Sequence, residues 1–403
     1  MVAPNAAADA HPPVEQLAPV EQLDALTSLR FVAAMYVLLF HYVAAFPGGS
    51  PNPNFTRFGY TGVTFFFILS GFILAHNYHA VDFGERLNRY RFFAARISRI
   101  YPVYLLSLLV SLPFALSALV KMPPGLLRNL AASSGLLAPL GMHAWVPGAS
   151  CAINCPAWSI STEFFFYLLF PFLVWRVMRS PGLWLAVTLG PWAIICIVYA
   201  VLWGAVAPGG SIIAHNEGTA PALLAQAIKY FPVGRLPEFV LGIVLYALWK
   251  RYRGQIDLSW ALAAFAGAAV LFAMIANHLP EILIHNGLTA VVWAPLILAA
   301  ASMRGGLLCS PLAIFLGRIS FALYLFHFPV LLAFLSLDKQ VFGSRLAQYP
   351  ASAIAAVTLM ALLVATLVYL RFEEASRRPV FRWLSRRWGL PDSRSPRPAH
   401  VEP

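Results

Sequence analysis

Charged residues are scarce in this sequence. Asp, Glu, Lys and Arg make up 11% of its 403 residues, against about 25% in typical soluble domains. Hydrophobic residues make up 60%, and apolar stretches of about 20 residues, the length of a membrane-spanning helix, recur along the chain. This composition excludes an ordinary soluble domain. The stretches are continuous and do not alternate, so the sequence predicts an all-α, polytopic transmembrane helix bundle and excludes a transmembrane β-barrel.

Cysteine is also rare, with four residues in the whole chain. Cys196 and Cys309 lie in or beside apolar stretches and are expected to be small buried hydrophobes. Cys151 and Cys155 lie in a polar loop, where either a disulfide or two free thiols fits the sequence. No second Cys/His pair has ligand spacing, so we predict no metal site and no permanently bound cofactor.

Acidic residues are fewer than basic ones, and the formal net charge is +12. The basic residues gather in alternate loops, which points to membrane topology and away from a nucleic-acid partner. With a cytoplasmic amino terminus, the cytoplasmic loops and tail hold 19 Lys and Arg and the outer loops hold seven, as the positive-inside rule requires. The first 24 residues contain no Lys or Arg, so no secretory signal peptide is expected. We therefore predict a multi-pass plasma membrane protein, located in the inner membrane of a bacterium.

Ten apolar stretches are long enough to cross a bilayer. They cover roughly residues 26–46, 60–79, 100–120, 158–178, 183–205, 235–250, 257–277, 286–303, 311–335 and 351–371. A shorter apolar piece at 126–140 is expected to be re-entrant or interfacial. The predicted organisation is a disordered cytoplasmic segment over 1–23, a ten-helix membrane domain over 24–388, and a disordered basic, Pro-rich cytoplasmic tail over 389–403.

The first stretch contains two ionisable residues, Arg30 and His41. Ionisable groups are costly inside a bilayer and are usually functional there. The two residues fall on one helical face, about 16 Å apart along the axis. Glu163, near the outer end of the fourth stretch, is expected at the same depth as His41. We predict that this carboxylate orients the imidazole as a general base; a His–Glu pair that only fastens two helices is the alternative.

Arg96 and Arg99 begin the third stretch and are expected to form a basic cluster with Arg30. Guanidinium groups suit phosphate oxygens, and contact with lipid phosphates is the alternative. Arg235 and Glu238, near an outer end, are expected either to form a salt bridge or to line an acceptor site. Small residues of the second stretch are expected to allow close helix packing: Gly62, Ser70 and Gly71. In the ninth stretch, we expect Tyr324 to pack and His327 to be interfacial.

Together these residues resemble the motifs of the acyltransferase 3 family of integral-membrane acyltransferases, over roughly residues 24–388. The first helix of that family carries a basic residue, ten variable positions and a histidine, which is similar to Arg30 and His41. Its cytoplasmic arginine motif resembles Arg96 and Arg99. Its remaining motifs resemble GVTFFFILSGF, SFALYLFH, and the set Trp158, Ser159, Ser161 and Glu163. Thr64 stands where relatives often carry an acidic residue.

The resemblance implies acyl transfer, commonly of acetyl, from acyl-CoA as co-substrate to a hydroxyl of an extracytoplasmic saccharide or glycosylated metabolite. It implies that His41 acts at the reacting centre and that the three arginines hold the donor. The remaining site residues are expected to bind substrate or support the site: Trp158, Ser159, Ser161, Arg235, Glu238, Tyr324 and His327. Many relatives also carry a fused hydrolase-like domain, and here we expect a stand-alone membrane domain surrounded by lipid.

Two other functions are compatible with these residues. One is a proton-coupled exporter of a saccharide or lipid-linked glycan, in which His41 and Glu163 would relay protons. It would not depend on CoA, and no matching pair of broken helices supports it. The other is a membrane sensor without chemistry, which the lack of an output domain argues against. The sequence leaves the acceptor and the oligomeric state open.

Overall fold

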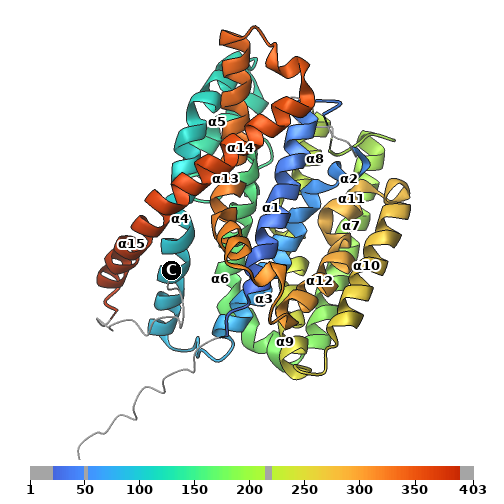
Figure 1. Ribbon diagram of the computed structural model, residues 1–403, viewed down its shortest axis with the longest axis vertical. Helices are drawn as coiled ribbons and strands as arrows, with labels where there is room; N and C mark the ends of the chain where they lie inside the picture. Colours follow the sequence, from blue (N-terminus) through green and yellow to red (C-terminus); the bar gives the residue numbers. More distant parts are fainter. Residues whose placement is uncertain (1–20, 50–52, 214–219, 391–403) are drawn as a thin grey trace, which may run out of the picture.

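The computed structural model describes residues 21–49, 53–213 and 220–390. Within them the protein is helical, without β-strands, and ten helical segments are long and apolar enough to cross a membrane, which confirms the predicted fold class (Figure 1). The principal helices of these segments are α1 (Asp24–Ala45), α3 (Gly62–Tyr78), α4 (Arg86–Lys121), α6 (Trp158–Arg179), α7 (Pro181–Val206), α9 (Leu236–Arg251), α10 (Leu258–Ile275), α12 (Ala290–Ser302), α13 (Pro311–Val341) and α14 (Pro350–Val368).

We call the end of the bundle at which α1 begins the basal end, and the opposite end the apical end. Shorter helices lie between or after the principal ones: α2 (Pro53–Thr56), α5 (Leu126–Leu137), α8 (Ala220–Tyr230), α11 (Glu281–Leu283) and α15 (Glu374–Arg387). The expected short piece at 126–140 corresponds to α5, whose 12 residues span about 18 Å, too little to cross a bilayer.

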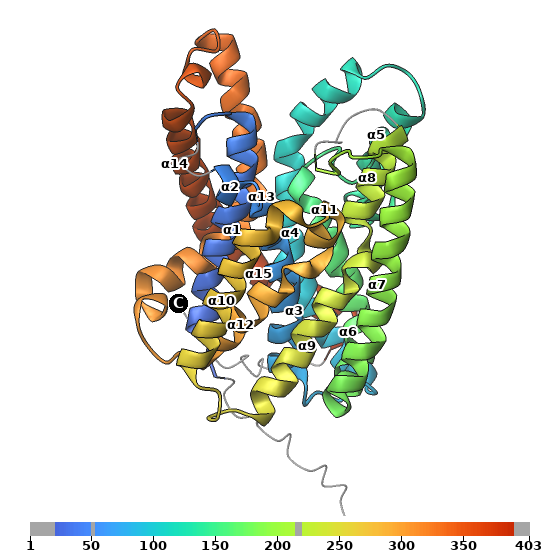
Figure 2. The ribbon, with the colours of Figure 1, turned by 90° about the vertical axis from the view of Figure 1, so that its right-hand side faces the viewer.

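Two helices are much longer than a bilayer requires. Helix α4 has 36 residues and α13 has 31, which correspond to about 54 and 46 Å. Figure 2 shows the apical parts of α13 and α14 and those of α4 and α5 as two separate projections above the rest of the bundle. Helix α4 begins at Arg86, well before the predicted start near residue 100, because its basic first turns are helical but not apolar.

The interior is formed around α3 and α9. In the span of each of these helices, 72% of the residues of the apolar stretch are buried, whereas 6% are buried in the span of α10 and 11% in that of α7. Helices α3 and α9 cross at very short distance. A Cβ added to Gly71 would lie 2.0 Å from the carbonyl oxygen of Phe239, and one added to Gly242 would lie 2.0 Å from that of Ile68. The predicted packing role of Gly71 is therefore confirmed, and glycine is required on both helices at this crossing.

The packed region begins and ends slightly outside the expected limits. Leu23 and Leu390 are both buried, whereas residues 1–20 and 391–403 of the two segments predicted to be disordered lie outside the described residues. Of the two alternatives for the polar loop, the structure has the disulfide between Cys151 and Cys155. Cys196 is buried as predicted, and Cys309 is half-buried.

Candidate functional site

A cavity of about 110 Å³ lies in the centre of the bundle, with walls from α1, α3, α4, α6 and α13. Its basal part is basic, since Arg30, Arg96 and Arg99 line it. Its apical part is lined by Ser159 of α6 and Tyr324 of α13, among others. The structure thus brings the three predicted arginines together around one space.

The arginines reach the cavity from two helices. Arg96 and Arg99 share a face of α4 because they are three residues apart, and Arg30 lies on α1. The guanidinium of Arg96 donates a hydrogen bond of 3.2 Å to the hydroxyl of Tyr78 and lies 5.4 Å from the centre of its ring. The Nε atom of Arg96 is buried and has no hydrogen-bond partner among the described residues. One donor of this guanidinium is therefore not satisfied within the described residues.

Glu163 also lines this cavity, and its neighbours differ from those we predicted. Its carboxylate accepts a hydrogen bond of 3.1 Å from Tyr167, and it interacts electrostatically with Arg30 and Arg99. No hydrogen bond joins it to His41 in the described part of the chain. The predicted pairing of Glu163 with His41 is wrong.

The error comes from the assumed depth of Trp158. The expected depth of Glu163 was counted from the outer end of the fourth stretch, but Trp158, the first residue of that stretch, is only 5% exposed. Its ring lies 4.9 Å from that of Tyr230 in α8, so other segments cover the beginning of α6. The count of residues from Trp158 therefore did not identify the neighbours of Glu163, which lies among Arg30, Arg99 and Tyr167.

The side-chain partner of His41 is His327. The Nε2 atom of His327 lies 3.2 Å from Nδ1 of His41, and the ring centres are 5.0 Å apart. Nδ1 of His41 also lies 2.9 Å from the carbonyl oxygen of Val37. His327 has no exposed surface, so the predicted interfacial position of this residue is wrong.

Tyr324 separates the two histidines from the cavity. Its hydroxyl lies 2.9 Å from that of Ser159, and its ring centre is 6.0 Å from that of His327. The ring of Phe66, another lining residue, meets Tyr324 edge-on at 5.5 Å. His41 is not among the residues that line the cavity. The expected packing residue Tyr324 therefore forms the apical wall of the cavity.

Ser161 lies outside the cavity and fastens a loop to α6. Its hydroxyl donates a 2.6 Å hydrogen bond to the carbonyl oxygen of Gly141 and accepts a 3.3 Å hydrogen bond from the backbone N–H of Ala144. In the same loop, burial lowers the pKa of His143 to about 4, so this histidine is neutral at pH 7. These contacts give Ser161 a structural position.

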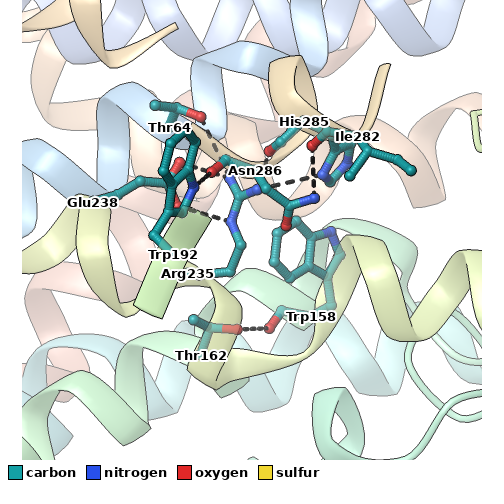
Figure 3. Close-up of polar contacts among 9 residues, drawn as sticks. All are labelled: Thr64, Trp158, Thr162, Trp192, Arg235, Glu238, Ile282, His285 and Asn286. Carbon is teal, nitrogen blue, oxygen red and sulfur yellow. Dashed lines mark hydrogen bonds and ion pairs between the residues drawn. The ribbon is translucent and has the colours of Figure 1, made fainter. Parts of the chain in front are cut away.

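Arg235 and Glu238 form a buried salt bridge, with an Nε–Oε2 distance of 2.9 Å and side-chain exposures of 1% and 3%. Figure 3 shows the surrounding polar contacts. The guanidinium also donates to the carbonyl oxygen of His285, and one of its amino groups lies 3.4 Å from the hydroxyl of Thr64. The Cζ atom of Arg235 lies over the Trp158 ring, 5.8 Å from the ring centre. Of the two alternatives, the structure shows the salt bridge.

Several residues around the arginines were not predicted. Ser70 was expected to be a packing position but lines the cavity. Tyr78 and Tyr167 gave no sequence signal, because buried tyrosines are common in helix bundles. Glu373 interacts electrostatically with Arg30 and Arg99. Its position directly after the last apolar stretch, on the side of the predicted basic cluster, was a usable signal.

Comparison with known proteins identifies similar chains. The model of a family described as "Acyltransferase domain" matches residues 23–370. The chain is 29% identical to "Acyltransferase MdmB" of Streptomyces mycarofaciens, over 95% of this chain and 97% of that protein. It is 30% identical to "Protein 2 in picA locus" of Rhizobium radiobacter, over 36% of this chain and 78% of that protein. No solved structure matches the chain.

Proposed function

Because this chain belongs to the acyltransferase 3 family of membrane acyltransferases, we propose that it transfers an acyl group, preferentially acetyl, from acyl-CoA on the cytoplasmic side to a hydroxyl of an extracytoplasmic saccharide or glycosylated metabolite. The basal end of the bundle would face the cytoplasm, and in a bacterium the protein would lie in the inner membrane. The name of the Streptomyces relative, which matches along nearly its whole length, supports acyl transfer.

The observation that carries the proposal is the shared cavity of Arg30, Arg96 and Arg99. Glu163 is the acidic residue in the lining, so the cavity wall carries more positive than negative charge. Buried charges need partners, and the phosphates of CoA would supply them through charge-assisted hydrogen bonds. We propose that the donor enters from the basal end and that its thioester arm points toward Tyr324.

At the apical end we assign His41 as the general base. Its Nε2 would take the proton of the acceptor hydroxyl, whose oxygen then forms a bond to the thioester carbonyl carbon. The carbon–sulfur bond breaks, and the proton passes from His41 to the departing CoA thiolate. Ser159 and Tyr324, whose hydroxyls lie 2.9 Å apart, are the nearest cavity groups that could donate to the developing oxyanion.

This path requires a movement of two aromatic rings. Phe66 and Tyr324 close the cavity below the histidines in the present conformation. A thioester reaches His41 only when the rings part, and their contact excludes water from the donor before an acceptor arrives. The small volume of the cavity favours a short acyl group.

The test follows a labelled acyl group. Membranes containing the wild-type chain or His41→Ala are given acetyl-CoA labelled in the acetyl group, and mass spectrometry follows the label into surface glycans and secreted metabolites. We expect one acyl-sized mass difference with the wild type and none with His41→Ala. His278→Ala, which changes an exposed histidine at the same end of the bundle, is the matched control and should retain transfer.

Two results would overturn the proposal. Full transfer by His41→Ala would remove the general base. Saccharide flux across the membrane without any labelled product would favour the exporter instead, although neither similar protein carries a transporter name.

A further inference from the structure

The contacts of the histidine pair fix the protonation of four ring nitrogens. Nδ1 of His327 lies 2.7 Å from the carbonyl oxygen of Tyr324. A carbonyl oxygen can only accept a hydrogen bond, so this nitrogen carries the proton of the neutral ring. Nε2 of His327 is then unprotonated and presents a lone pair, and it is this atom that faces His41 at 3.2 Å.

The same reasoning applies to His41. Its Nδ1 faces two acceptors, the carbonyl oxygen of Val37 at 2.9 Å and Nε2 of His327 at 3.2 Å. Nδ1 therefore carries the proton. Nε2 of His41 is left with its lone pair, and no described residue forms a hydrogen bond with it. A general base needs a lone pair that no other group of the protein occupies.

We propose that His327 is the positioning residue for His41: together with the carbonyl oxygen of Val37, its lone pair favours the tautomer of His41 that leaves Nε2 bare, and it holds the ring as Nε2 accepts the hydroxyl proton. The inference rests on the proposed function. His327 fills the part that a carboxylate plays in a catalytic triad, the part that the sequence had suggested for Glu163. It does so from a second helix, since His41 is on α1 and His327 on α13.

The surroundings of His327 fit a fixed orientation. The residue is completely buried, and the hydroxyl of Tyr42 donates a 2.9 Å hydrogen bond to its carbonyl oxygen. Its ring centre also lies 6.0 Å from that of Tyr324, the apical wall of the cavity. His327 therefore neighbours both the apical wall of the cavity and His41.

The test compares two amide variants. In His327→Gln the side-chain oxygen can reach the position of Nε2 and accept from His41. In His327→Asn the shorter amide reaches only the position of Nδ1. It can still donate to the carbonyl oxygen of Tyr324, but no atom remains at the position of Nε2 to accept a hydrogen bond from His41. Both are measured in proteoliposomes by CoA release over a range of acetyl-CoA concentrations, with a fixed saturating amount of cellular glycan and metabolite extract as acceptor.

We expect His327→Asn to lower kcat roughly 10- to 100-fold, the loss that follows removal of the group that orients a metal-bound histidine, with the donor KM within about two-fold of wild type. His327→Gln should restore most of kcat. Thermal unfolding of both variants shows whether the amount of folded protein is equal, and kcat is expressed per folded molecule.

The outcomes separate this inference from the proposed function. If His41→Ala is inactive while His327→Asn turns over like the wild type, His41 remains the general base but the positioning role of His327 is wrong. Equal loss of kcat in the Gln and Asn variants at unchanged unfolding temperature also overturns the positioning role, because an acceptor at the Nε2 position would then be irrelevant. Full activity of His41→Ala instead overturns the assignment of His41 as the general base of the proposed function.

Discussion

Individual arginines in the central cavity differ in what they already bind. Arg96 is hydrogen-bonded to Tyr78 and interacts electrostatically with Glu163, whereas Arg30 and Arg99 interact electrostatically with both Glu163 and Glu373. A donor phosphate would have to compete with these carboxylates. We therefore expect Glu163 to act near the donor. Its negative charge would offset the buried positive charges of the arginines when no donor is bound.

Replacing Arg99 tests whether the basic cluster holds the donor. Arg99→Ala removes one charge-assisted contact, which is worth about 1.5–3 kcal/mol, so the donor KM should rise about ten-fold or more with a smaller change in kcat. The measurement is CoA release against acetyl-CoA concentration. Arg86→Ala is the matched control, since Arg86 is exposed at the start of the same helix and contacts Tyr90. An unchanged KM for Arg99→Ala would contradict the assignment.

At the scale of helices, hydropathy predicted what depends on local composition. All ten spans were predicted because each needs only about 20 apolar residues in a row. The basic first turns of α4, from Arg86, were missed for the same reason, since they carry the helix beyond the apolar region. Depth was less predictable. Trp158, the first residue of the fourth stretch, is covered by other segments, and the side-chain partner of His41 is His327 and not Glu163.

The crossing of α3 and α9 gives a prediction about stability. Gly242→Ala would place a Cβ 2.0 Å from the carbonyl oxygen of Ile68, and overpacking of this kind costs about 1–3 kcal/mol or more. We expect a clearly lower thermal unfolding midpoint in detergent, measured by intrinsic fluorescence. Gly267→Ala in α10 is the control, because nothing lies within 4 Å of a Cβ there and alanine favours a helix by roughly 0.5–1 kcal/mol. Equal midpoints for the two variants would show that the helices can separate at no cost.

At the scale of the whole molecule, charge and covalent structure agree on one orientation. The basal loops and the tail carry most of the Lys and Arg, which favours the cytoplasm. The disulfide between Cys151 and Cys155 lies in a loop near the apical end, and disulfides persist in oxidising compartments. The arginine end of the cavity would then face cytosolic CoA, and the histidine end would face the acceptor outside.

Two introduced cysteines test this orientation in a chain whose four native cysteines are replaced by serine. Gln348 follows α13 in an exposed apical loop, and Gln255 follows α9 in an exposed basal loop. We expect a membrane-impermeant maleimide to label Gln348→Cys in intact cells and Gln255→Cys only after the cells are permeabilised. The reverse pattern would place the arginines outside, where no cytosolic donor reaches them, and the proposed direction of transfer would have to be abandoned.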